Sequence, residues 1–232
     1  MQKIFLHPLP IRIWHCINAV GFVTMILTGI QIRYVGLVDV VSFRTAVTVH
    51  NYTGLVLICN YFIWLLFYLS SDKIRVYHPQ LNPIKHFRAS FRQIQYYSYG
   101  IFTGSPSPHQ PNAYDKFNPL QSMTYQIVMF LMVPAAFVTG VLLWNVKGFP
   151  GAVAFFGGVR VVDTVHVLIF IFFSFFIFFH VYLGSLGHTP TAHYKAMFIT
   201  GYEEVDDHAV NGETSKAEPS TDPAQIARNG GS

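Results

Sequence analysis

The sequence R-V-V-D-T-V-H-V-L-I-F-I-F-F-S-F-F-I-F-F-H-V-Y-L-G occupies residues 160–184. The thirteen residues between His166 and His180 are Val, Leu, Ile and Phe with one Ser, and none is charged. A run of this length crosses a bilayer as a helix, which needs about 20 apolar residues. At about 3.6 residues per turn, both imidazoles lie on nearly one face, roughly 21 Å apart along the axis. Ionisable side chains in hydrocarbon are costly, so both histidines are candidates for a functional site.

The composition of the whole chain is that of a membrane protein. Only 11% of its 232 residues are charged and 52% are hydrophobic, whereas about 25% of a soluble domain is charged. We expect an all-α membrane protein, with residues 1–205 as one domain. The acidic and then Ser/Pro/Gly-rich segment 206–232 is too polar to fold alone, so we expect a disordered tail. Four apolar runs predict a bundle of four transmembrane helices at about 11–34, 45–69, 120–144 and 161–184.

The connection between the second and third runs is basic. Residues 70–119 contain six Lys and Arg residues, whereas the loops on the other side contain four. The positive-inside rule therefore places this connection and both termini in the cytoplasm. Asn82-Pro83 can start a helix in which Ile84, Phe87 and Phe91 share one face beside basic residues, and this pattern is typical of an amphipathic helix on the membrane surface.

This topology assigns a depth to each of four membrane histidines. His15 starts the first helix and His180 ends the fourth, so both lie near the inner surface. His50 and His166 both start helices that run inward, so both lie near the outer surface. Exchanging partners would require rings to meet across roughly 21 Å. We therefore expect two bis-histidine haem b groups, an inner one on His15 and His180 and an outer one on His50 and His166, with no ligand from the third helix.

Other metal chemistry fits the sequence less well. The absence of Cys-x-x-Cys-His excludes covalent c-type haem attachment. A structural zinc needs four ligands at one point, whereas the four histidines are divided between two depths.

Arg12 precedes His15 by one turn and Arg160 lies near His166, so each is a candidate contact for haem propionates. An interfacial anchor explains either arginine equally well.

Several stretches resemble those of a known family, and they are R-I-W-H at 12–15, V-H-N-Y-T-G at 49–54, Y-D-K-F-N-P-L-Q at 114–121 and H-V-Y-L-G at 180–184. Over about residues 5–205, the chain resembles the four-helix dihaem cytochrome b subunits of nickel-iron hydrogenases, formate dehydrogenases and thiosulfate-reductase-like enzymes. The resemblance implies the same four haem ligands and a quinone site beside the inner haem, lined by Asn118. A helix start at Asn118-Pro119 explains that asparagine equally well.

These observations predict a dihaem cytochrome b subunit that anchors a respiratory complex in the cytoplasmic (inner) membrane. It would pass electrons between a periplasmic iron-sulfur or catalytic subunit and the membrane quinone, without other substrate chemistry. We expect contact with lipid and none with nucleic acid. Three alternatives remain: a stand-alone cytochrome b561-type oxidoreductase, a haem-free proton-coupled transporter that uses the histidines as a relay, and a purely structural membrane anchor.

Overall fold

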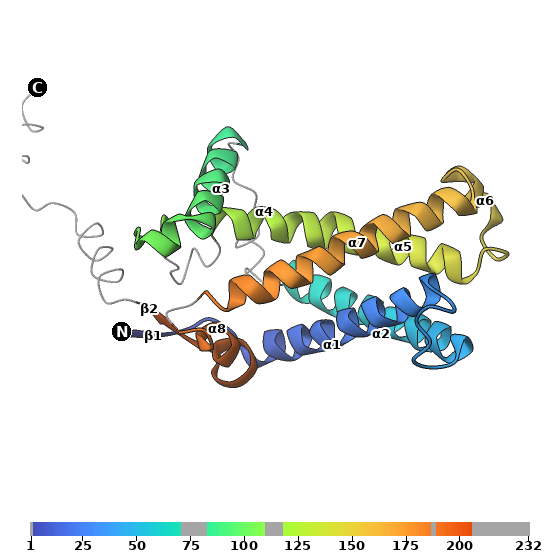
Figure 1. Cartoon of the computed structure of the whole chain (residues 1–232), viewed down its shortest axis with the longest axis horizontal. Coiled ribbons are helices and arrows are strands. Elements are labelled where there is room, and N and C mark those ends of the chain that lie inside the picture. The colour runs from blue at the N-terminus through green and yellow to red at the C-terminus, as the bar shows by residue number, and fades with distance from the viewer. Residues whose placement is uncertain (1, 71–82, 110–117, 187–188, 206–232) are drawn as a thin grey trace, which may run out of the picture.

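Four long helices dominate the computed structural model, which describes residues 2–70, 83–109, 118–186 and 189–205 (Figure 1). Each is long and apolar enough to cross a membrane. They are α1 (Leu9–Arg33), α2 (Phe43–Leu69), the composite span of α4 (Pro119–Ile127), η3 (Val128–Met132) and α5 (Val133–Trp144), and α7 (Val159–Gly184). Every span begins and ends within two residues of its predicted range. The expected tail, 206–232, lies outside the described residues.

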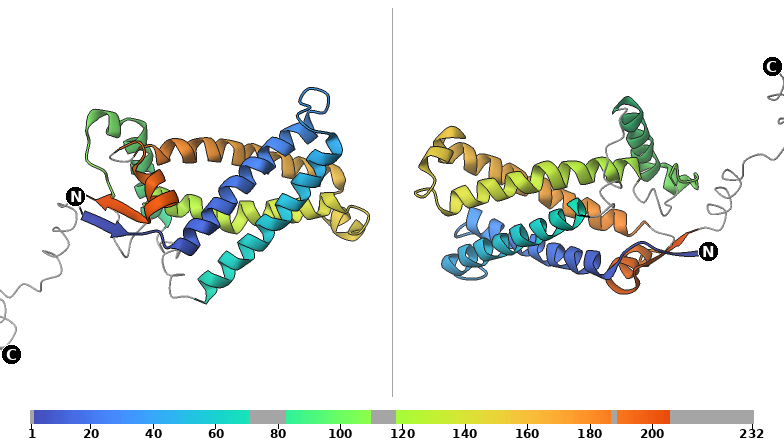
Figure 2. Two further views of the ribbon diagram at one scale, coloured as in Figure 1. Left: turned by 90° about the horizontal axis from the view of Figure 1, so that it is seen from below. Right: turned by 180° about the vertical axis from the view of Figure 1, so that it is seen from behind.

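The spans form two neighbouring pairs. Helix α1 packs along α2, and α5 packs along α7 (Figures 1 and 2). The amino terminus, α3 (Pro83–Ser98) and α8 (Ala192–Lys195) lie at one end of the bundle, called here the terminal end. The short helix α6 (Pro150–Phe155) lies at the other, called here the α6 end.

Much of the surface of the spans is apolar. On α7, Phe175, Phe178 and Phe179 are 62%, 69% and 56% exposed, whereas Phe173 is buried in the aromatic core. A soluble protein rarely exposes so large an apolar area. Lipid contact removes the need to bury these rings, because hydrocarbon solvates them as well as a protein core does.

The third span contains a π-helical turn, η3, which ends two residues before Pro134. Proline disturbs a helix because it has no N–H to donate. Met129 lies five residues earlier, so its carbonyl is the one that a π-register N–H at residue 134 would bind. The Tyr61 hydroxyl of α2 donates to that carbonyl instead, at 3.1 Å. A neighbouring helix thus supplies the donor that proline lacks.

Helix α3 is amphipathic, as the sequence predicts, and it buries its polar side. Ile84 and Phe87 are 72% and 68% exposed, whereas Ser90 and Gln93 are each 2% exposed. The short helix η2 (Gly100–Thr103) continues the chain from its end. The exposed apolar side is suited to lipid, and α3 packs on α4, to which Tyr97 is joined by a hydrogen bond from Asn118.

A small antiparallel ribbon corrects the expectation of an entirely helical chain. Strand β1 (Gln2–Phe5) pairs with β2 (Tyr202–Val205), which follows η4 (Ala196–Thr200). Gly201 lies at the junction with φ +79°, and a Cβ there would approach the His7 carbonyl oxygen to 2.7 Å. Four-residue strands are too short to show a period in sequence, and their pairing depends on the bundle bringing the two segments together.

Candidate functional site

Four histidines from three spans form two pairs. The terminal-end pair joins His15 of α1 to His180 of α7, with ring centroids 6.1 Å apart and an interplanar angle of 44°. The α6-end pair joins His50 of α2 to His166 of α7, with centroids 6.3 Å apart and an angle of 70°. The structure thus brings together the same partners that helix depth predicts.

The spacing of each pair fits one metal ion between the two rings. An imidazole nitrogen binds a metal at about 2 Å, and the ring centroid lies about 1 Å further away, so two rings on opposite sides have centroids about 6 Å apart. Among the described residues, no three His, Cys, Asp or Glu side chains converge on one point. A metal held by either pair therefore needs its other ligands from a cofactor, and the four nitrogens of a haem meet that need.

Threonine hydroxyls hold both rings of the α6-end pair. The Oγ1 atom of Thr28 in α1 lies 2.9 Å from Nδ1 of His50. The Oγ1 atom of Thr139 in α5 lies 2.8 Å from Nδ1 of His166. With Nδ1 engaged, Nε2 of each ring is the nitrogen left to bind iron. The third span supplies no histidine, but it does orient one.

A glycine adjoins each of these threonines and lies beside the same ring. A Cβ on Gly29 would lie 3.6 Å from Cε1 of His50, and one on Gly140 would lie 3.3 Å from Cε1 of His166. The first distance is an ordinary contact and the second is tight. The backbones of α1 and α5 therefore approach the rings closely because no side chain intervenes.

The terminal-end pair has different surroundings. Phe176 stacks on His180, with centroids 5.5 Å apart and an angle of 19°. Phe198, in η4, meets His15 edge-on with centroids 5.7 Å apart. Within the described residues, Nδ1 of His15 is buried without a hydrogen-bond partner. Aromatic rings, rather than hydroxyls, thus surround this pair.

Arg12 lies at the terminal end and binds backbone carbonyls. Its Nε donates to the carbonyl of Met197 at 3.1 Å, and its Nη2 donates to those of Phe198 and Ile199 at 3.0 and 2.6 Å. These bonds fasten η4 to the start of α1, which holds Phe198 against His15. A propionate contact of Arg12 stays a prediction, and it would depend on the remaining Nη1 group.

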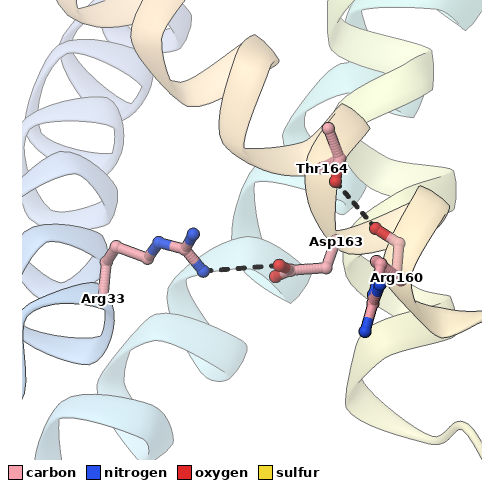
Figure 3. Close-up of polar contacts among 4 residues, drawn as sticks. All are labelled: Arg33, Arg160, Asp163 and Thr164. Carbon is pink, nitrogen blue, oxygen red and sulfur yellow. Dashed lines mark hydrogen bonds and ion pairs between the residues drawn. The ribbon is translucent and has the colours of Figure 1, made fainter.

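Arg160 lies at the α6 end beside an ion pair that links α1 to α7. Arg33 reaches Asp163 at 3.4 Å, and both side chains are about half exposed (Figure 3). Such an exposed pair contributes little to stability, on the order of 0–1 kcal/mol. The guanidinium of Arg160 points away from Asp163 in Figure 3 and makes no ion pair within the described residues. It stays a candidate propionate contact.

Asn118 is the N-cap of α4 and is 4% exposed. Its Oδ1 accepts from the backbone N–H of Gln121 at 2.8 Å, and the Gln121 side chain accepts from the backbone N–H of Asn118 at 3.1 Å. Its amide also donates to the Tyr97 hydroxyl of α3, at 3.1 Å. The structure thus shows the helix start, and a role in a quinone site stays a prediction.

Sequence reasoning missed the two threonines. Each belongs to a Thr-Gly dipeptide in an apolar run, which is a visible signal. However, Thr-Gly occurs five times in the chain, at residues 28, 53, 103, 139 and 200. Only the rotation of each helix in the bundle decides which of these dipeptides meets a histidine.

Comparison with known proteins agrees with this geometry. Residues 6–199 match the family described as "Prokaryotic cytochrome b561". A protein of Escherichia coli (strain K12) named "Putative cytochrome YdhU" is 32% identical over 204 residues, which cover 87% of this chain and 75% of that protein. No solved structure matches the chain significantly. Two histidine pairs in a bundle of four apolar spans are what a haem-binding membrane protein needs, and the chain belongs to the prokaryotic cytochrome b561 family of multi-pass membrane cytochromes.

Proposed function

We propose that this chain is the dihaem cytochrome b subunit that anchors a respiratory oxidoreductase and carries electrons between a periplasmic partner enzyme and the membrane quinone. The observation that supports it is the placement of one histidine pair toward each end of the bundle, each with the spacing of a bis-imidazole iron site. Two carriers at two depths provide a path across the bilayer, which a single site does not.

The terminal end would be the cytoplasmic one. Helix α3 exposes an apolar side flanked by Lys85, Arg88 and Arg92, a combination suited to the boundary of an anionic leaflet. On this orientation, His15 and His180 hold the inner haem b. The α6-end pair holds the outer one, where a periplasmic iron-sulfur or catalytic subunit would exchange electrons.

Each bound haem would supply a one-electron carrier that alternates between ferric and ferrous iron. The four histidines bind the two irons and set the orientation of the axial rings. The apolar side chains between the pairs exclude water, so that ions cannot leak along the same path. Arg160 would be available to neutralise a propionate at the α6 end, because its guanidinium makes no ion pair among the described residues.

The quinone would bind at the terminal end, near Asn118 and Tyr97. The bond between these two residues joins α3 to the start of α4, and α7 ends at the same end of the bundle (Figure 1). A phenol hydroxyl and a buried amide can both donate to a quinone carbonyl. Protons for quinone reduction would then come from the cytoplasm.

The purified full-length chain tests this function directly. We expect about two acid-acetone-extractable haems per chain with the low-spin spectrum of bis-histidine b haems, because each histidine pair binds one iron. Isolation from native membranes in mild detergent should also recover a periplasmic redox subunit. A colourless protein would refute the proposal in favour of a transporter. A dihaem protein that consistently purifies alone, and still reduces quinone, would instead support the stand-alone oxidoreductase.

Tyr97→Phe tests the quinone site without disturbing the capping box of α4. Because one hydrogen bond contributes about 0.5–1.5 kcal/mol, we expect the KM for a quinone analogue to rise by up to about tenfold, with haem content unchanged. Tyr96→Phe is the matched control, since Tyr96 packs beside Tyr97 with centroids 5.5 Å apart. Equal KM values for both variants and the wild type would place the quinone elsewhere.

A further inference from the structure

We propose that Thr28 and Thr139 are positioning residues for the outer haem, which fix Nε2 of His50 and His166 toward iron and lower the reduction potential of that haem relative to the same site without them. This inference rests on the ligand assignment in the proposed function. The two threonines lie in α1 and α5, which supply no ligand to the outer haem.

The direction of each bond follows from the inventory of hydroxyl protons. A threonine hydroxyl has one proton to donate. Thr28 donates it to the Thr24 carbonyl at 2.7 Å, and Thr139 donates to the Ala135 carbonyl at 2.7 Å. Each oxygen must therefore accept from the histidine, so Nδ1 carries the proton and Nε2 keeps its lone pair for a metal.

The two halves of the site repeat one arrangement. In each half, a Thr-Gly pair on one helix contacts the histidine of the helix packed beside it. The pair on α1 contacts the histidine of α2, and the pair on α5 contacts the histidine of α7. The threonine fixes the Nδ1 edge of the ring, and the following glycine makes room for Cε1, 3.6 Å away at Gly29 and 3.3 Å away at Gly140. A single contact between a hydroxyl and a histidine could arise by chance. Chance does not explain the same arrangement in both halves of the site.

The terminal-end pair lacks this arrangement. Nδ1 of His15 is buried without an acceptor among the described residues, and aromatic rings pack against His15 and His180. A ligand that donates its second N–H to an acceptor is a stronger electron donor to its metal. Stronger donation favours ferric iron, so the threonines lower the potential of one haem and leave the other unaffected.

Thr28→Val and Thr139→Val are the test, because valine keeps the shape of threonine and removes the acceptor. We expect each to shift the reduction equilibrium of the outer haem about tenfold toward ferrous iron, which is about 59 mV for a one-electron couple. The shift is measured by redox potentiometry, and a change in the low-spin EPR signal of the same haem should accompany it. Thr28→Ser keeps the hydroxyl, so its reduction potential and EPR signal should match those of the wild type.

Thr24→Val is the matched control. Thr24 lies one turn before Thr28 and makes the same bond to a carbonyl four residues earlier, at 2.9 Å, but it makes no hydrogen bond to a histidine within the described part of the chain. Unchanged potentials and EPR signals for both haems in both valine variants would overturn the inference. Equal damage to both haems would also overturn it, because the threonines would then act on the bundle as a whole. A wild-type protein without bis-histidine haems would refute the proposed function instead.

Discussion

Replacing His180 with alanine should remove one haem of two and leave the other in place. The terminal-end iron would lose one of its two protein ligands, and no third His, Cys, Asp or Glu of the described residues converges on that point to replace it. The α6-end pair shares α7 with His180 but lies 14 residues away at His166, roughly 21 Å along the helix. We therefore expect haem content to fall from about two to about one per chain.

The measurement is haem content together with the reduced spectrum and a redox titration. Quinone-linked turnover should fall by at least about a hundredfold, because the carrier nearest the quinone is missing. His15→Ala should remove the same spectral component, since the two residues share one iron. His109→Ala, in a loop of the described chain, is the matched histidine control and should retain both haems. Full haem content in His180→Ala would disprove the ligand assignment.

Replacing His50 or His166 with alanine should give the complementary result. Both variants should lose the outer haem and keep the inner one, because their rings face one another with centroids 6.3 Å apart. The remaining haem should still equilibrate with a quinol analogue, while electron exchange with a periplasmic partner should stop. Loss of partner exchange without loss of quinol equilibration would distinguish two haem sites from one, since a single shared site would lose both activities together.

A titration of all four alanine variants measures that separation. His50→Ala and His166→Ala should lack one and the same redox component, and His15→Ala and His180→Ala should lack the other. Thr164→Val provides a control within α7, because among the described residues its hydroxyl bonds only the carbonyl of Arg160 near the start of the helix, at 2.8 Å. If His50→Ala and His15→Ala lose the same component, the pairing is wrong.

The pairing of the histidines could be predicted because it depends on depth alone. A helix rises about 1.5 Å per residue, so the position of a histidine within its span gives its height in the bilayer. Alternation of direction then leaves His15 one possible partner on α7, and the structure places His180 there at 6.1 Å. Similarly, α3 could be predicted, because its apolar face recurs at helical spacing.

Contacts that depend on rotation about a helix axis could not be predicted. The sequence did not predict that Nε and Nη2 of Arg12 bind the carbonyls of η4. These contacts join residues more than 180 positions apart. The pairing of β1 with β2 could not be predicted either, because neither strand has a partner until the bundle brings the two segments together.

From its sequence alone, the chain is determined to be a four-span membrane protein with two histidine pairs at opposite depths, since apolar length and helical rise are local properties. Only the tertiary structure decided which residues surround those pairs. Thr28 and Thr139 resemble three other Thr-Gly threonines of the chain in sequence, and within the described structure only these two meet a histidine Nδ1. The physical reason is that helix packing sets the rotation of each helix, and packing depends on all four spans at once.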